Sequence, residues 1–205
     1  MAYLFANPFL LIIGLINDTS IFMELKKSNE KRENNKQHRI REFKVGDLAV
    51  YPAHGVGKIK AIESRVVNGE KHDFYILNVL EKSMVIMIPT CNVESVGLRD
   101  VISKKEIPKV YEVIKKDRES LIDNQTWNRR YREYMDKIKT GSLYDVAEVF
   151  RDLYFLKITK NLSFGERKLF DTATTLLLSE LSTAKNTDEA TIMSEIESLF
   201  KIDPL

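Results

Sequence analysis

The period of the apolar residues changes near residue 101, and this change separates two kinds of fold along the chain. Before Asp100, short runs rich in β-branched residues alternate with turn sequences, which is typical of β-strands. After Val101, apolar residues recur at helical spacing, which is typical of amphipathic helices. The sequence therefore predicts an α+β protein in which an N-terminal β-domain is followed by an all-α domain.

The β-domain is predicted between residues 43 and 101. Asn68-Gly69 is a type I′ hairpin signal, because both residues tolerate a positive φ. Pro89 ends a strand, because a proline cannot donate to the ladder. Short strands in so small a segment predict an SH3-like or Tudor-like barrel of five strands. The strands marked by composition are Leu48 to Tyr51, Val56 to Val67, Phe74 to Leu80 and Met84 to Ile88.

Five helices are predicted between residues 102 and 205. Ser142 and Ser163 each precede an acidic residue by three positions, the spacing of a capping box, and so mark two helix starts. Gly141 ends the predicted helix that precedes Ser142. The helices are expected to begin near Pro108, Trp127, Ser142, Ser163 and Asp188, and to pack their apolar faces into one bundle.

Residues 1–42 fit neither pattern. Tyr3 to Ile16 is almost wholly apolar, but it is short for a membrane span and lacks the flanks of a secretory signal. We interpret residues 1–22 as an extension upstream of a true start at Met23; the alternative is a weak membrane anchor. Residues 23–42 are polar and rich in Lys, Asn and Glu, which predicts a flexible basic leader.

The charges are segregated along the chain, although the net charge is only +2. Residues 104–139 carry 11 basic and 7 acidic side chains, a net of +4, and residues 140–205 carry 7 and 11, a net of −4. Residues 45–100 are close to neutral, with 6 basic and 7 acidic side chains. A nucleic-acid surface must therefore come from local clusters of basic residues and not from an overall excess.

No catalytic or metal-binding pattern is present in the sequence. His38, His54 and His72 have no helical spacing to one another or to Cys91, so no zinc site is expected. The single cysteine fits a reducing cytoplasm. Gly55 to Lys58 resembles a phosphate loop only faintly, since it leads into a predicted strand and not into a helix. We expect a cytoplasmic binding protein without catalytic residues, metal or cofactor.

Four ordered motifs point to one family. They are FKVGD-x-x-VYP-x-HG from Phe43, TW-x-RRY from Thr126, VAEV-x-RDL from Val146 and LS-x-GERK from Leu162. In this order they resemble the CarD/CdnL family of bacterial transcription regulators over about residues 43–200. The resemblance implies a Tudor-like domain, residues 43–101, that binds the RNA polymerase β subunit. It also implies that the helical domain, residues 102–205, contacts promoter DNA at the upstream edge of the transcription bubble and stabilises the open complex. We expect the protein to be a monomer.

The resemblance also assigns residues to the polymerase contact, which in the family is an edge-to-edge pairing of strands. Arg65 matches a family arginine of that contact, whereas the second such arginine falls at Met87. A methionine cannot form the charge-assisted bonds of a guanidinium. We therefore expect either that Arg65, Lys71 and Lys82 carry the charge or that the polymerase surface has changed. The alternative for Arg65 is a solvated charge at a strand end.

Trp127 is the only tryptophan of the chain, and its spacing and its position favour different surroundings. It shares a helical stripe with Tyr131, Tyr134 and Ile138, which favours burial. Its place at the start of a helix favours an exposed ring. The family resemblance implies that Trp127 is a wedge at the fork between double- and single-stranded DNA, with Tyr131 and Tyr134 holding the helix to the bundle.

Basic residues around this ring are predicted to contact the DNA backbone with little base specificity. Arg129, Arg130 and Arg132 surround Trp127 on the same helix. Arg167 and Lys168 match family positions near DNA and lie at a helix start, where cations oppose the helix dipole unless an anion joins them. The alternative for this pair is a solvated helix start.

Two other functions remain open at this point. One is a Tudor-like adaptor whose basic helices bind RNA or the ribosome, with Trp127 buried and no promoter role. The other is a membrane-tethered adaptor that uses Leu10 to Ile16.

Overall fold

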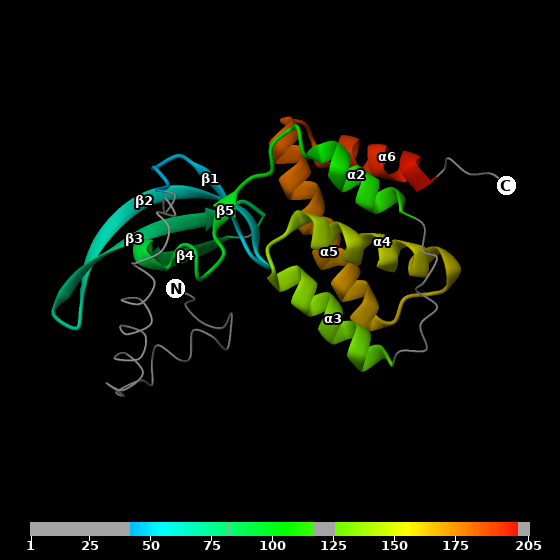
Figure 1. The fold of residues 1–205 in the computed structure, drawn as a ribbon, viewed down its shortest axis with the longest axis horizontal. Helices are drawn as coiled ribbons and strands as arrows, with labels where there is room; N and C mark the ends of the chain where they lie inside the picture. Colours follow the sequence, from blue (N-terminus) through cyan, green and yellow to red (C-terminus); the bar gives the residue numbers. More distant parts are fainter. Residues whose placement is uncertain (1–41, 82, 117–125, 201–205) are drawn as a thin grey trace, which may run out of the picture. The chain divides into compact units, whose positions relative to one another are not determined.

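The fold is given by a computed structural model, which describes residues 42–81, 83–116 and 126–200 (Figure 1). These residues all belong to one compact unit, Ile40–Leu205. The expectations for residues 1–41 and for Lys82 concern parts of the chain outside the described residues.

The N-terminal part of the described chain is a five-stranded antiparallel sheet in the order β4-β3-β2-β1-β5. Phe43, Tyr75 and Leu77 belong to the hydrophobic core that it encloses. This confirms the predicted Tudor-like β-domain. The strands are β1 (Leu48–Tyr51), β2 (Gly55–Val67), β3 (Glu70–Val79), β4 (Met84–Pro89) and β5 (Arg99–Asp100).

The β2–β3 hairpin is longer than the apolar pattern indicates. Asn68 and Gly69 have φ values of 54° and 82°, as the predicted turn requires. β3 begins at Glu70 and not at Phe74, because Glu70 and the residues after it pair with the exposed end of β2. This end of the hairpin lies beyond the core, so polar residues such as Glu70 and Lys71 form strand there and Val66 is exposed.

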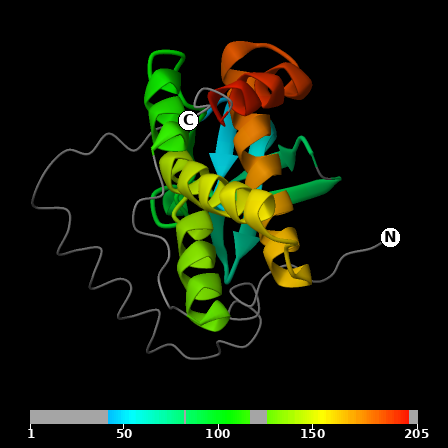
Figure 2. The same ribbon diagram turned by 90° about the vertical axis from the view of Figure 1, so that its right-hand side faces the viewer.

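The helical part contains five described helices, in agreement with the expected bundle. Ser142 accepts a hydrogen bond from the Asp145 amide at 3.3 Å, and Ser163 forms a complete capping box with Glu166. α4 crosses the bundle and packs against α2, α3 and α5 (Figure 2). The helices are α2 (Ile107–Lys115), α3 (Trp127–Lys139), α4 (Leu143–Thr159), α5 (Phe164–Lys185) and α6 (Glu189–Phe200).

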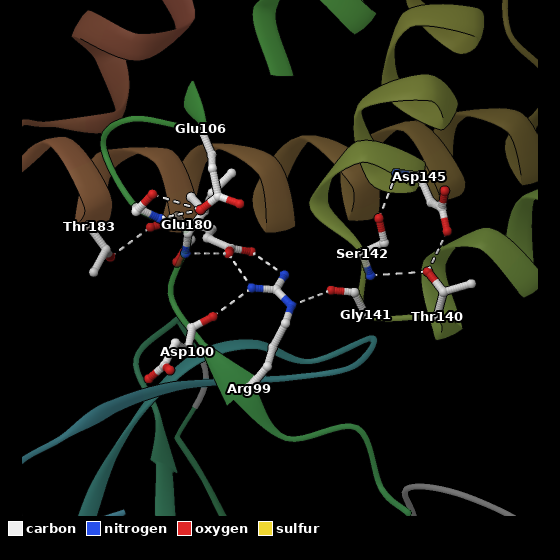
Figure 3. A network of polar contacts seen from close by, with 12 residues as sticks. Arg99, Asp100, Glu106, Thr140, Gly141, Ser142, Asp145, Glu180 and Thr183 are labelled. Atoms are coloured by element: carbon white, nitrogen blue, oxygen red, sulfur yellow. Dashed lines mark hydrogen bonds and ion pairs between the residues drawn. The ribbon is translucent and has the colours of Figure 1, made fainter. Parts of the chain in front are cut away.

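An ion pair joins the sheet to the bundle (Figure 3). Arg99, on β5, donates to both carboxylate oxygens of Glu180, on α5, at 2.5 and 2.8 Å. Arg99 Nε also donates to the Gly141 carbonyl at 2.7 Å, and Glu180 accepts from the Ile102 amide at 3.1 Å. Glu180 is 3% exposed. The pair therefore joins a half-buried arginine to a buried carboxylate, and a local sequence pattern could not reveal it.

Close backbone approach supports this junction on its other side. A Cβ at Gly141 would lie 2.9 Å from Cγ of Pro52, and a Cβ at Gly55 would lie 3.1 Å from a methyl group of Leu176. Gly141 also has a φ of 77°, which suits the end of α3. The turn between β1 and β2 can therefore touch the bundle only because these positions lack side chains.

Candidate nucleic-acid interface and sheet edge

The first turns of α3 and α5 lie together and bring the predicted DNA-binding residues to one end of the bundle. We call this surface the aromatic end. The indole of Trp127 rests on Gly165: a Cβ added there would lie 2.8 Å from Cζ2 of the indole. Any side chain at position 165 would therefore displace the ring. The aromatic end comprises Trp127, Arg129, Arg132, Phe164, Arg167 and Lys168.

Trp127 is half-buried, which falls between the two surroundings that the sequence left open. It packs against the edge of the bundle core, and its ring lies 5.6 Å from that of Tyr131. Tyr131 is 41% exposed, whereas Tyr134 and Ile138 are buried. The expectation that Tyr131 holds α3 to the bundle is therefore wrong. Tyr134 and Ile138 do so, because both side chains belong to the buried core of the bundle.

Arg130 points to a buried carboxylate. Its Nη2 lies 3.6 Å from Oε1 of Glu166, which is 3% exposed and also accepts from Nζ of Lys160 at 3.1 Å. Burial raises the pKa of Glu166, but hydrogen bonds from Ser163 and Lys160 outweigh this effect and hold the pKa below its ordinary value. Glu166 is therefore an anion near neutral pH. Arg130 is the least exposed of the three predicted arginines, and its contact connects α3 with α5.

The other predicted cations are open to solvent. Arg129 pairs with Glu133 at 3.1 Å, and both side chains are at least half exposed. An exposed pair of this kind is weak, so Arg129 can exchange its partner for a phosphate. Arg132, Arg167 and Lys168 are exposed, and none of the three forms an ion pair with a carboxylate of the described residues.

The sequence analysis missed Phe164, the first residue of α5. Its side chain is 85% exposed, although it lies directly between the helix cap Ser163 and the seat Gly165. The capping-box pattern specifies Ser163 and Glu166 but not the residue type at position 164. The available signal was that Phe164 falls outside the buried stripe of α5, which begins with Leu169 and Phe170.

The predicted polymerase residues that the structure describes lie on three strands: Met87 on β4, Lys71 on β3 and Arg65 on β2. β4 pairs with β3 and with no other strand of the described residues, so its outer backbone groups face away from the sheet. Met87 is 42% exposed and Val85 is 58% exposed. We call this strand, with these two side chains, the β4 edge.

Arg65 lies on the same face of the sheet as Met87. Met87 stands opposite Ile76, and Ile76 stands opposite Ala61. Arg65 follows Ala61 by four residues without a shift in register, so strand alternation places it on that face. It is 53% exposed and pairs with Glu63 at 2.9 Å.

Lys71 does not join Arg65 on this face. It pairs with Val66, and alternation directs its side chain to the other face of the hairpin. Lys82 lies outside the described residues, and the structure places the other two charges that were expected to compensate for Met87 on opposite faces.

Residues 42–81, 83–116 and 126–200 contain no group of three or more His, Cys, Asp or Glu side chains that could hold a metal ion. Within these ranges no helix has the length and the apolar composition that crossing a membrane requires.

Comparisons with known proteins match both parts of the described chain. A family model described as "CarD-like/TRCF RID domain" matches residues 43–102, and one described as "CarD, C-terminal domain" matches residues 109–197. A Bacillus subtilis (strain 168) protein named "Putative transcription factor YdeB" is 38% identical over 155 residues, which cover 74% of this chain and 98% of that protein. A solved structure titled "CdnLNt from Myxoccoccus xanthus" is 49% identical in sequence. The match covers 34% of this chain and 97% of the chain in that structure, with a TM-score of 0.28.

Proposed function

Because the chain belongs to the CarD/CdnL family of transcription regulators, we propose that it bridges RNA polymerase and promoter DNA and stabilises the open complex. In this proposal the β4 edge binds the polymerase β subunit, and the aromatic end binds DNA at the upstream edge of the transcription bubble. The protein acts as a monomer in the cytoplasm and catalyses no reaction.

The observation that carries the DNA half of the proposal is the seat of Trp127 on Gly165. The seat fixes one side of the indole and leaves the ring half-buried, with exposed cations on the first turns of the same two helices. An aromatic wedge that enters from the minor groove unstacks a base step at a cost on the order of a few kcal/mol. At a fork most of this cost is already met, so a wedge there hinders closure of the bubble and prolongs the open state.

The exposed cations would hold the DNA around the wedge. Arg129, Arg132, Arg167 and Lys168 can each reach a phosphate without breaking a strong contact in the protein. Phosphate contacts fix the register of the duplex but carry no sequence information, so we expect little base specificity. Arg130 has a different role in this proposal: through Glu166 it keeps α3 aligned with α5.

The β4 edge supports the polymerase half of the proposal. An edge strand can accept a further strand from a partner, in which case backbone bonds give affinity and side chains give specificity. Val85 and Met87 would place apolar contacts beside that added strand, with Arg65 on the same face of the sheet. We propose that the polymerase surface opposite Met87 is apolar, which replaces the charge complementarity that an arginine would provide.

The test is the half-life of polymerase open complexes with the wild-type protein and with Trp127→Ala. We expect the variant to lose most of the stabilisation and still to be captured with the polymerase β subunit. Equal half-lives would contradict the wedge. Binding to RNA or the ribosome without any effect on open complexes would instead favour an adaptor with no promoter role.

A further inference from the structure

We propose that Phe164 is a second aromatic contact to DNA, which stacks on an unpaired base of the single strand that leaves the fork. The inference rests on the proposed function, and it adds a partner for a side chain to which neither the motifs nor the fold gives a role. Trp127 would separate the base step, and Phe164 would hold a base beyond it.

The exposure of Phe164 is the first reason. At 85% it exceeds the exposure of Val66 and of Ile158, which are 74% and 64% exposed. A phenylalanine in water contributes nothing to the hydrophobic core, whereas a buried one stabilises a fold appreciably. The ring is therefore available to a partner, and its absence would leave the packing of the described bundle unchanged.

Its place beside the wedge is the second reason. Gly165, the seat of the Trp127 indole, follows Phe164 directly in the chain. Both helix starts lie at the same end of the bundle (Figures 1 and 2). A fork that Trp127 enters would therefore bring its first unpaired bases close to Phe164.

The charge around Phe164 identifies the class of partner. Arg167 and Lys168 follow Phe164 by three and four residues, so on a helix their side chains lie on the same face as its ring. Neither forms an ion pair with a described carboxylate. A ring flanked by two open cations suits a ligand that is both aromatic and anionic. Single-stranded nucleic acid has this chemistry, because every base offers a face for stacking and every linkage a phosphate.

Two backbone amides at this helix start already have acceptors within the protein. The Glu166 amide donates to Oγ of Ser163 at 3.4 Å, and the Arg167 amide donates to the Ser163 carbonyl at 2.9 Å. A phosphate would have to displace these bonds to reach the two amides. The exposed side chains of Phe164, Arg167 and Lys168 are therefore the binding groups in this proposal.

The experiment compares two DNA ligands at low salt, a blunt duplex and the same duplex with a single-stranded arm, each titrated with the full chain. We expect Phe164→Ala to weaken binding to the forked DNA about tenfold, as loss of one stacked base implies, with duplex binding unchanged. Phe164→Tyr should restore the affinity for the fork. Ile158→Ala is the matched control, because it removes another exposed apolar side chain without touching the proposed contact.

Two results would overturn the inference. One is that Phe164→Ala binds the fork as tightly as the wild type does. This result overturns the inference also if the variant no longer self-associates. The other is an equal loss on fork and duplex, which would make Phe164 a general contact. If Trp127→Ala weakens fork binding and Phe164→Ala does not, only this inference fails. If neither variant differs from the wild type, the proposed function fails as well.

Discussion

The β4 edge and the aromatic end both expose apolar side chains, but they differ in what the backbone offers to a partner. The outer backbone of β4 faces no strand of the described residues. At the start of α5, the side chains of Ser163 and Glu166 already accept hydrogen bonds from each other's backbone amides. Binding at the β4 edge should therefore tolerate many side-chain changes, whereas binding at the aromatic end should depend on a few side chains and on the glycine beneath them.

The two surfaces can act as one bridge only if the junction between sheet and bundle holds. Arg99→Ala leaves the Glu180 carboxylate buried without its cation, and we expect it to lower the free energy of unfolding by about 3 kcal/mol. Arg65→Ala is the control: it breaks the exposed pair with Glu63 and should cost no more than about 0.5 kcal/mol. Urea denaturation measures both values. Similar losses in the two variants would contradict a structural junction.

The seat of the wedge gives the next largest effect. In Gly165→Ala the new methyl group would lie 2.8 Å from the indole, so the ring must move toward solvent. Overpacking of this size costs roughly 1–3 kcal/mol. We expect the emission maximum of Trp127 to shift to longer wavelength and the open-complex half-life to fall, while polymerase capture remains. Because Trp127 is the only tryptophan, the emission reports this site alone.

Gly69→Ala is the matched control for that substitution, since it changes a glycine in the β2–β3 turn. Its Trp127 emission should equal that of the wild type. An unshifted emission in Gly165→Ala would show that the indole does not rest on this glycine.

The tolerance of the β4 edge can be tested at Met87. We expect Met87→Arg to weaken polymerase binding about fivefold, or by about 1 kcal/mol, because the guanidinium must lose water against an apolar surface. Met87→Leu should bind as the wild type does. Equilibrium binding to the isolated polymerase β subunit measures the three affinities. Tighter binding by Met87→Arg would show that the partner surface is acidic there.

The smallest expected effect is the dependence of stability on pH at the base of the aromatic end. The pKa of folded Glu166 lies below its ordinary value of 4.5. The ionised group therefore contributes stability that is present above about pH 4.5 and is lost as the pH falls through the folded-state pKa. We expect urea midpoints to fall less between about pH 6 and about pH 3 in Glu166→Gln than in the wild type. Parallel curves would contradict this role of Glu166.

Much of the fold could be predicted from the local sequence. The change of period separates sheet from bundle, and the serine caps fix the starts of α4 and α5. Asn68-Gly69 gives the hairpin turn. Each of these features depends on residues a few positions apart, where spacing and backbone preference decide the outcome.

The remainder depends on contacts between distant residues. Arg99 and Glu180 are 81 positions apart, and no local pattern pairs them. The partner of Arg130 and the seat of Trp127 both come from another helix. Phe164 differs from these, because its place outside the buried apolar stripe of α5 could be read from helical spacing, whereas its nearness to Trp127 could not.

The most direct test of the bridge places 2-aminopurine at the upstream fork of a promoter bound by polymerase. This base is bright when unstacked, so it reports the step that the wedge should open. With the wild-type protein we predict a rise in fluorescence that Trp127→Ala does not produce, although both proteins remain bound to the polymerase. The same rise with Trp127→Ala would contradict the account.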